Sequence, residues 1–121
     1  MPFERFTAWR KCQELALAIY RVTQQFPPDE RYGLTSQTRR AAYSAAANIS
    51  EGSAKRGTAE FCRYLNISLG SLSELAYAMR LVKDLELLGI ADWQRIEELR
   101  SEASKSTWGL YRSIQRKKKA G

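Results

Sequence analysis

The chain has 121 residues, a length typical of one domain, and 44% of them are hydrophobic. Lysine and arginine number 20 against 13 acidic residues, so the formal charge at pH 7 is +7. No stretch is long and apolar enough for a transmembrane helix, and the mixed segment from Met1 to Trp9 does not have the pattern of a signal peptide. We therefore expect a cytoplasmic protein without membrane contact.

The composition also argues against an enzyme. Histidine is absent, which removes the commonest general base and the Ser–His and Cys–His couples. Cys12 and Cys62 are far apart in the sequence and form no CxxC motif, so we predict reduced core thiols and no zinc site. No glycine-rich phosphate loop occurs. We predict no catalytic residues, no metal and no cofactor.

The first predicted helix covers residues 8–25. Trp9, Cys12, Leu15 and Ile19 recur at spacings of three and four, which indicates one apolar face. Pro27 and Pro28 end the helix, because proline disfavours the helical conformation of the residue before it.

The second predicted helix covers residues 35–54 and has small side chains on its inner face, which allow a neighbouring helix to approach closely. This face consists of Ala41, Ala42, Ala45, Ala46 and Ile49. Gly52 and Gly57 bracket the end of the helix, where glycine is the usual stop.

The third predicted helix covers residues 58–88 and carries an apolar seam with alternating spacings of four and three. The seam consists of Phe61, Leu65, Ser68, Leu72, Leu75, Met79 and Val82. Further apolar residues lie outside it, and two interpretations stay open. The helix has either one broad core face or a second face that contacts another molecule.

The fourth predicted helix covers residues 93–118, with Asp92 as its N-cap and the basic run Arg116 to Lys119 at its C-terminal end. Short connections between four amphipathic helices predict an all-α, antiparallel, up-down-up-down four-helix bundle. We expect residues 1–121 to form this single domain.

The excess positive charge lies in residues 31–57 and 91–121. A localised basic surface is typical of nucleic-acid binding. The candidate binding residues are Arg39, Arg40, Lys55, Arg56, Arg112, Arg116, Lys117, Lys118 and Lys119. In an antiparallel bundle the ends of the second and fourth helices lie together, so Lys55 and Arg56 would approach the C-terminal lysines and form one basic cap. Tyr43 and Tyr111 would offer stacking faces beside these groups. The alternative is a solvated basic surface with no ligand.

Several short motifs resemble a known family. They are YGLTSQ at 32–37, RRAA at 39–42, ANISEG at 47–52 and SLGSLSEL at 68–75. Together they resemble the bacterial four-helix-bundle family encoded in intervening sequences of 23S rRNA genes, over about residues 3–90. The resemblance implies a cytosolic bundle that assembles as a ring, namely a homopentamer. It also implies a distant similarity to accessory variability proteins of diversity-generating retroelements, which are basic pentameric barrels that bind nucleic acid and a reverse transcriptase.

The motif residues also have a structural interpretation. Asn48 and Glu51 lie about one turn apart on the second helix, as do Ser71 and Glu74 on the third. With Arg39 or Arg40 they would form a polar network that fixes the register of the two helices, because buried polar groups need partners. We expect Gly70 to help this close packing.

Two functions remain. The first is a non-enzymatic oligomer that binds RNA or DNA through phosphate contacts. The alternative is an interaction scaffold for a protein partner such as a polymerase.

Overall fold

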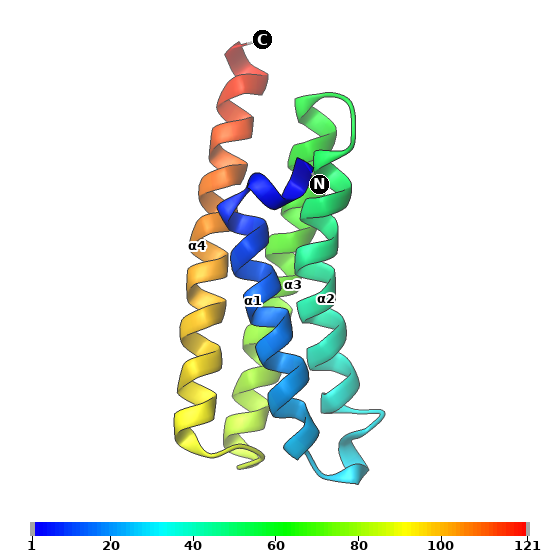
Figure 1. Ribbon diagram of the computed structural model, residues 1–121, viewed down its shortest axis with the longest axis vertical. Helices are drawn as coiled ribbons and strands as arrows, with labels where there is room; N and C mark the ends of the chain where they lie inside the picture. The colour runs from blue at the N-terminus through cyan, green and yellow to red at the C-terminus, as the bar shows by residue number, and fades with distance from the viewer. Residues whose placement is uncertain (1, 121) are drawn as a thin grey trace.

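The computed structural model describes residues 2–120 and is a bundle of four helices (Figure 1). The helices are α1 (Thr7–Val22), α2 (Leu34–Ser53), α3 (Thr58–Asp84) and α4 (Ile90–Ala120). They run alternately up and down the long axis, and α4 returns beside α1. The short 3-10 helices are η1 (Pro2–Arg5), η2 (Thr23–Gln25) and η3 (Pro28–Glu30). The predicted all-α antiparallel bundle is confirmed, whereas the ring assembly stays a prediction.

All four helices contribute to one core. Its largest fully buried side chains include Leu15, Ile19, Ile49, Leu65, Leu72, Leu75, Met79 and Ile96. Burying each such side chain contributes about 1.5–3 kcal/mol to folding. Every position of the predicted α3 seam is buried, so the core accounts for that stripe in full. Ile67 and Tyr77 are the large apolar side chains of α3 that stay exposed.

The helix ends follow the sequence closely, with three differences. Helix α1 ends at Val22, before the predicted residue 25, and the 3-10 helix η2 follows it. Helix α3 ends at Asp84, before the predicted residue 88, because Glu86 adopts a left-handed conformation with φ of 57°. The N–H of Leu87 then donates to the carbonyl of Val82 at 3.0 Å, and the N–H of Glu86 donates to Lys83 at 3.0 Å, as in a Schellman motif. Helix α4 begins at Ile90, so Asp92 lies inside its first turn and is not the N-cap.

Gly52 has a different role from the one predicted. It lies inside α2 and is buried, and α2 continues to Ser53. A Cβ atom on Gly52 would lie 2.6 Å from Cβ of Tyr64 and 3.0 Å from Cδ1 of Phe61, so glycine permits the close approach of α3. The backbone conformation that favours glycine occurs instead at Gly57, which has a φ of 90° and lies in the loop just before α3.

Gly70 does not contribute to close packing, contrary to the prediction. It is exposed, and a Cβ atom there would have no neighbour within 4 Å. The two cysteines are free and buried, so their predicted place in the core is confirmed.

Candidate nucleic-acid interface

A small polar cluster joins α2 to α3 and is centred on Ser44. The amide of Asn48 donates to the carbonyl of Ser44 at 2.8 Å and to its hydroxyl at 3.0 Å. The hydroxyl of Ser71 donates to the hydroxyl of Ser44 at 2.7 Å, and buried Ser68 donates to the carbonyl of Ala45 at 2.7 Å. These directional contacts fix the register of two helices that otherwise meet through small apolar side chains.

The predicted polar network is smaller than expected. The structure links Asn48 to Ser71 through Ser44, but Glu51 and Glu74 take no part. Glu51 is exposed and lies 3.9 Å from Lys55, whereas exposed Glu74 makes no hydrogen bond or ion pair with any described residue. Sequence reasoning missed Ser44, although its place one turn before Asn48 on the same helix was a usable signal.

Arg39 and Arg40 also lie outside that network. Arg39 turns to the C-terminal end of α1, where its Nε donates to Oγ1 of Thr23, the first residue of η2, at 2.8 Å. Arg40 is exposed and has no ion-pair partner within the described chain. The alternative in which one of them pairs with Glu51 or Glu74 is therefore wrong.

The predicted binding residues form two groups, and the first gathers at one end of the bundle. We call it the C-terminal basic end, and it consists of Lys55, Arg56, Arg112, Arg116, Lys117, Lys118 and Lys119. The α2–α3 loop and the last turns of α4 lie at this same end, with α4 reaching beyond the loop (Figure 1).

The cations of the C-terminal basic end are largely uncompensated. All of them are exposed. Lys55 lies near Glu51 and over the ring of Tyr64 at 5.6 Å, whereas the others have no ion-pair partner among residues 2–120. No acidic residue follows Glu102 in the sequence. An unbalanced set of cations creates a positive potential that attracts polyanions.

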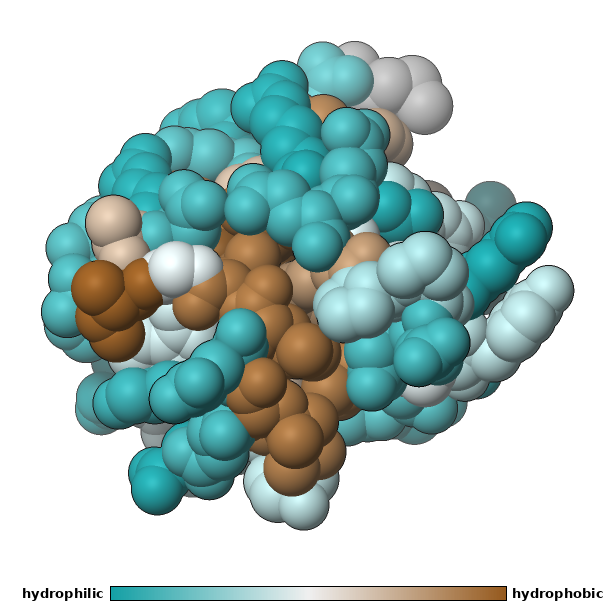
Figure 2. All heavy atoms as spheres, turned by 90° about the horizontal axis from the view of Figure 1, so that it is seen from below, coloured by the Kyte–Doolittle hydropathy of each residue, from teal (hydrophilic) through white to brown (hydrophobic). Residues whose placement is uncertain are grey.

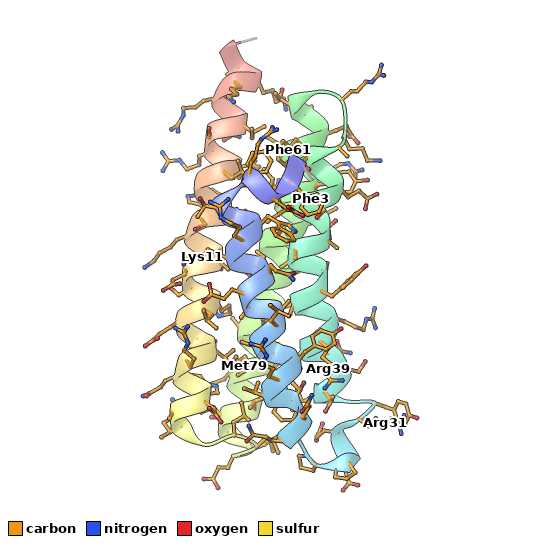
Figure 3. The ribbon with its side chains drawn as sticks, in the orientation of Figure 1. Phe3, Lys11, Arg31, Arg39, Phe61 and Met79 are labelled. Atoms are coloured by element: carbon orange, nitrogen blue, oxygen red, sulfur yellow. The ribbon has the colours of Figure 1, made fainter. Side chains whose placement is uncertain are left out.

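The second group, Arg39 and Arg40, lies toward the opposite end of the bundle, outside the predicted basic cap of Lys55, Arg56 and the C-terminal lysines. Figure 3 shows Arg31 and Arg39 in this lower part of the bundle. Here an open hollow of about 760 Å³ lies along α2. We call it the arginine–tyrosine hollow, after the residues Tyr20, Arg31, Tyr32, Arg39, Arg40 and Tyr43. Thr35, Ser36, Gln37, Ala41, Ser44, Ser71 and Glu74 complete its lining.

Aromatic rings hold two of these arginines. The guanidinium of Arg39 lies over the ring of Tyr20, 4.9 Å from its centroid, and that of Arg31 lies 5.5 Å from the centroid of Tyr32. The hydroxyl of Thr23, which orients Arg39, itself donates to the carbonyl of Ile19 at 2.7 Å. Sequence reasoning missed Tyr20, Arg31 and Tyr32 as members of a site, because the hollow depends on the contact between α1 and α2, which leaves no local pattern.

The turn before α2 positions Arg31 and Tyr32. The carboxylate of Glu30 accepts the N–H of Leu34 at 2.9 Å and so caps the helix. A Cβ atom on Gly33 would lie 2.7 Å from this carboxylate oxygen, so the glycine leaves room for the contact.

A more apolar groove of about 660 Å³ lies next to this hollow, between α1 and α2. Its lining includes Trp9, Leu17, Ala46 and Ala47, and it shares Tyr20 and Tyr43 with the hollow. Apolar side chains also gather at the end of the bundle seen from below (Figure 2). There, in the α3–α4 turn, Leu85 is 56% exposed; Ile90, at the start of α4, is 58% exposed.

A metal site and a membrane-spanning helix are both absent from the described part of the chain. Across residues 2–120 no group of three metal-ligating side chains converges. Within the same range no helix combines the length and the apolar character needed to span a bilayer.

Burial raises the pKa of the Cys12 thiol from 9.0 to about 11, against the smaller lowering effects of hydrogen bonds to Thr107 and Ser68.

Comparison with known proteins supports the fold and gives the family. A search of curated proteins finds no match. The chain is similar to a solved structure from Bacteroides thetaiotaomicron, a protein of unknown function from the S23 ribosomal protein family. The two share 23% identity with a TM-score of 0.80, over 87% of this chain and 98% of that one. Residues 4–109 match the family described as 23S rRNA-intervening sequence protein. This chain belongs to the 23S rRNA-intervening sequence protein family.

Proposed function

We propose that this protein is a non-enzymatic, cytoplasmic, nucleic-acid-binding protein that holds RNA or DNA by phosphate contacts at its C-terminal basic end. The observation that carries the proposal is the set of exposed cations gathered there with almost no carboxylate partners. Each lysine or arginine that neutralises a phosphate releases a counterion, so affinity falls steeply with salt. Contacts of this kind position a nucleic acid without reading its sequence.

Two features support a binding role over catalysis. Histidine is absent from the chain. The burial that raises the pKa of Cys12 to about 11 keeps this thiol neutral near pH 7, and a neutral thiol is a poor nucleophile.

We further propose a homopentameric ring, which rests on the family resemblance. The part of the apolar groove formed by Trp9, Leu17, Ala46 and Ala47 is consistent with such self-association, since exposed apolar patches commonly mark interfaces. Several linked basic ends would bind one polyanion more tightly than a single copy does. Light scattering coupled to size exclusion measures the copy number, and a monomer at micromolar concentration would contradict the ring.

The deciding experiment is fluorescence anisotropy with labelled single- and double-stranded RNA and DNA over a salt series. A variant with Arg116→Gln, Lys117→Gln, Lys118→Gln and Lys119→Gln tests the site. Because it removes four cations, the log–log salt slope becomes shallower by up to about 3.6 for duplex DNA and about 2.8 for a single strand. The matched control changes Arg80, Lys83, Arg95 and Lys105 to Gln, which removes the same charge away from this end. Equal losses in both variants would point to net charge alone, and no binding at low salt would overturn the proposal.

The apolar groove favours a second candidate, a scaffold for a protein partner such as a polymerase. This candidate predicts weak binding to naked nucleic acid. It also predicts that a partner protein stays bound to the wild type after nuclease treatment. The Leu17→Glu variant, which changes the groove wall, should not bind this partner.

A further inference from the structure

We propose that the arginine–tyrosine hollow is a separate subsite for single-stranded nucleic acid, in which tyrosines stack on unpaired bases and arginines hold the adjoining phosphates. The inference rests on the proposed nucleic-acid function and adds to it a strand preference and a second location.

The stacking faces are unusually exposed for large aromatic side chains. Tyr32 is 87% exposed, Tyr43 is 65% exposed and Tyr20 is 44% exposed, and all of them line one hollow. Tyr43 makes no aromatic or cation–π contact with any other described residue, so neither interaction occupies its ring. Base–aromatic stacking accepts any base, because every base has a π-face, and losing one stack weakens binding roughly five- to a hundredfold.

The cations lie beside these rings. Arg40 is one turn from Tyr43 on α2, it is exposed, and no described carboxylate pairs with it. Arg39 is already oriented by Thr23 and Tyr20, so binding costs less side-chain entropy there. Arg31 lies over Tyr32, and an arginine beside an exposed ring serves both phosphate contact and stacking.

The remaining lining favours a base over a purely anionic ligand. Glu74 places one carboxylate in the hollow, which repels phosphate but accepts hydrogen bonds from the amino groups of bases. Ser36 and Gln37 add further polar groups. The volume of about 760 Å³ lies within the roughly 300–1,000 Å³ typical of small-ligand pockets.

A duplex does not meet these requirements. Its bases are stacked on one another and are not available to the tyrosines, whereas an unpaired strand can turn its bases outward. The hollow and the C-terminal basic end therefore differ in ligand. The first needs unpaired bases, and the second needs only phosphates.

The test measures the affinity of a labelled single-stranded RNA of about twelve nucleotides and of its blunt duplex. The double variant Tyr32→Ala/Tyr43→Ala is expected to weaken single-strand binding at least tenfold and to leave duplex binding within about twofold. The matched variant Tyr32→Phe/Tyr43→Phe keeps the rings and is expected to bind as the wild type does. In the same strand, the fluorescence of a 2-aminopurine base is quenched by the wild type and not by the alanine variant.

A second measurement tests the phosphate part of the subsite. Arg40→Gln is expected to make the salt slope for the single strand shallower by about 0.7 and to leave the duplex slope unchanged. Circular dichroism and thermal melting check that each variant is folded, which the exposure of these side chains favours.

The outcomes separate this inference from the proposed function. If the wild type binds neither strand at low salt, both are overturned. If single strand and duplex bind equally and the alanine variant changes neither, the subsite is overturned and the proposed function stands. If the alanine variant instead changes the copy number seen by light scattering, the hollow is a contact between copies and the subsite is again overturned.

Discussion

Helices α2 and α3 meet through backbone and small side chains, whereas α1 and α4 are joined at the surface by long charged ones. Gly52 lies directly against Tyr64, and Ser68 reaches the backbone carbonyl of Ala45. Between α1 and α4, by contrast, Lys11 lies 3.2 Å from Glu102, and Arg95 lies 3.5 Å from Glu14. The α2–α3 contact leaves no room for a larger side chain, whereas the surface of the α1–α4 contact consists of flexible ion pairs.

The difference shows where the molecule tolerates change. A close contact between backbones cannot absorb an added methyl group, since packed interiors transmit strain. Exposed ion pairs contribute little, because water screens them and the side chains lose entropy. Helix α2 also carries Arg39, Arg40 and Tyr43, so the rigid contact with α3 supports one wall of the arginine–tyrosine hollow.

The largest expected effect is that of Gly52→Ala. The added Cβ atom would lie 2.6 Å from Cβ of Tyr64, so α2 and α3 must separate, and we expect a loss of about 1–3 kcal/mol in the free energy of unfolding. Urea denaturation measures it. Gly70→Ala is the matched control, because open space surrounds that position, and it is expected to stabilise α3 by up to about 1 kcal/mol. Equal effects of the two substitutions would mean that the helices adjust freely.

Cys12 lies in the buried part of the α1–α4 contact. Ionisation of its thiol at high pH is expected to lower the free energy of unfolding by about 2 kcal/mol. Its Sγ lies 3.7 Å from Oγ1 of Thr107, and burial raises its pKa from 9.0 to about 11. Because the folded state favours the neutral thiol, the stabilisation is complete below pH 9 and is lost as the pH rises through 11. Denaturation of wild type and Cys12→Ala at pH 8, 9, 10 and 11 measures the difference in slope. Parallel curves would contradict the assignment.

Ser68→Ala removes the hydrogen bond to the carbonyl of Ala45 and is expected to lower the free energy of unfolding by about 1 kcal/mol. Ser73 lies exposed on the same helix, so Ser73→Ala controls for the change in helix propensity and should leave stability nearly unchanged. Thermal melting distinguishes them. If both variants melt together, the small polar cluster does not hold α2 to α3.

The smallest effect is expected for the ion pair of Lys11 and Glu102. A double-mutant cycle with Lys11→Met and Glu102→Gln should give a coupling of less than about 0.5 kcal/mol. The coupling should vanish in 1 M salt, where screening extends over only about 3 Å. A coupling above about 1 kcal/mol that persists in salt would show that the two helix contacts are of the same kind.

The sequence was sufficient for the fold because its signals are local. The spacing of Leu65, Leu72 and Leu75 predicts the buried face of α3, and the two prolines predict the break after α1. The early end of α3 was not predictable in this way, since Glu86 adopts a conformation usually taken by glycine. The role of Gly52 was missed because it depends on the side chain that faces it from another helix.

The candidate site was only partly predictable. The basic residues were identified by composition, but their division into two groups follows from where each lies along its helix. Arg39 and Arg40 come early in α2, and Lys55 comes after its end, so the length of the helix separates them. Tyr20 and Tyr32 were not predicted at all. Tyr20 joins the hollow only because α1 packs against α2, which brings its ring beside Arg39.

The position of the C-terminal basic end has a consequence for how the molecule moves in an electric field. Antiparallel neighbours largely cancel one another's helix dipoles, so the side-chain charges determine the dipole moment of the whole bundle. At the far end, five acidic residues largely offset six basic ones: Asp29, Glu30, Asp84, Glu86 and Asp92 against Arg21, Arg31, Arg39, Arg40, Arg80 and Lys83. The dipole therefore lies along the bundle axis, with its positive pole where α4 ends. A polyanion exerts a torque on such a molecule and orients that pole toward itself before contact, so salt should slow association far more than it hastens release.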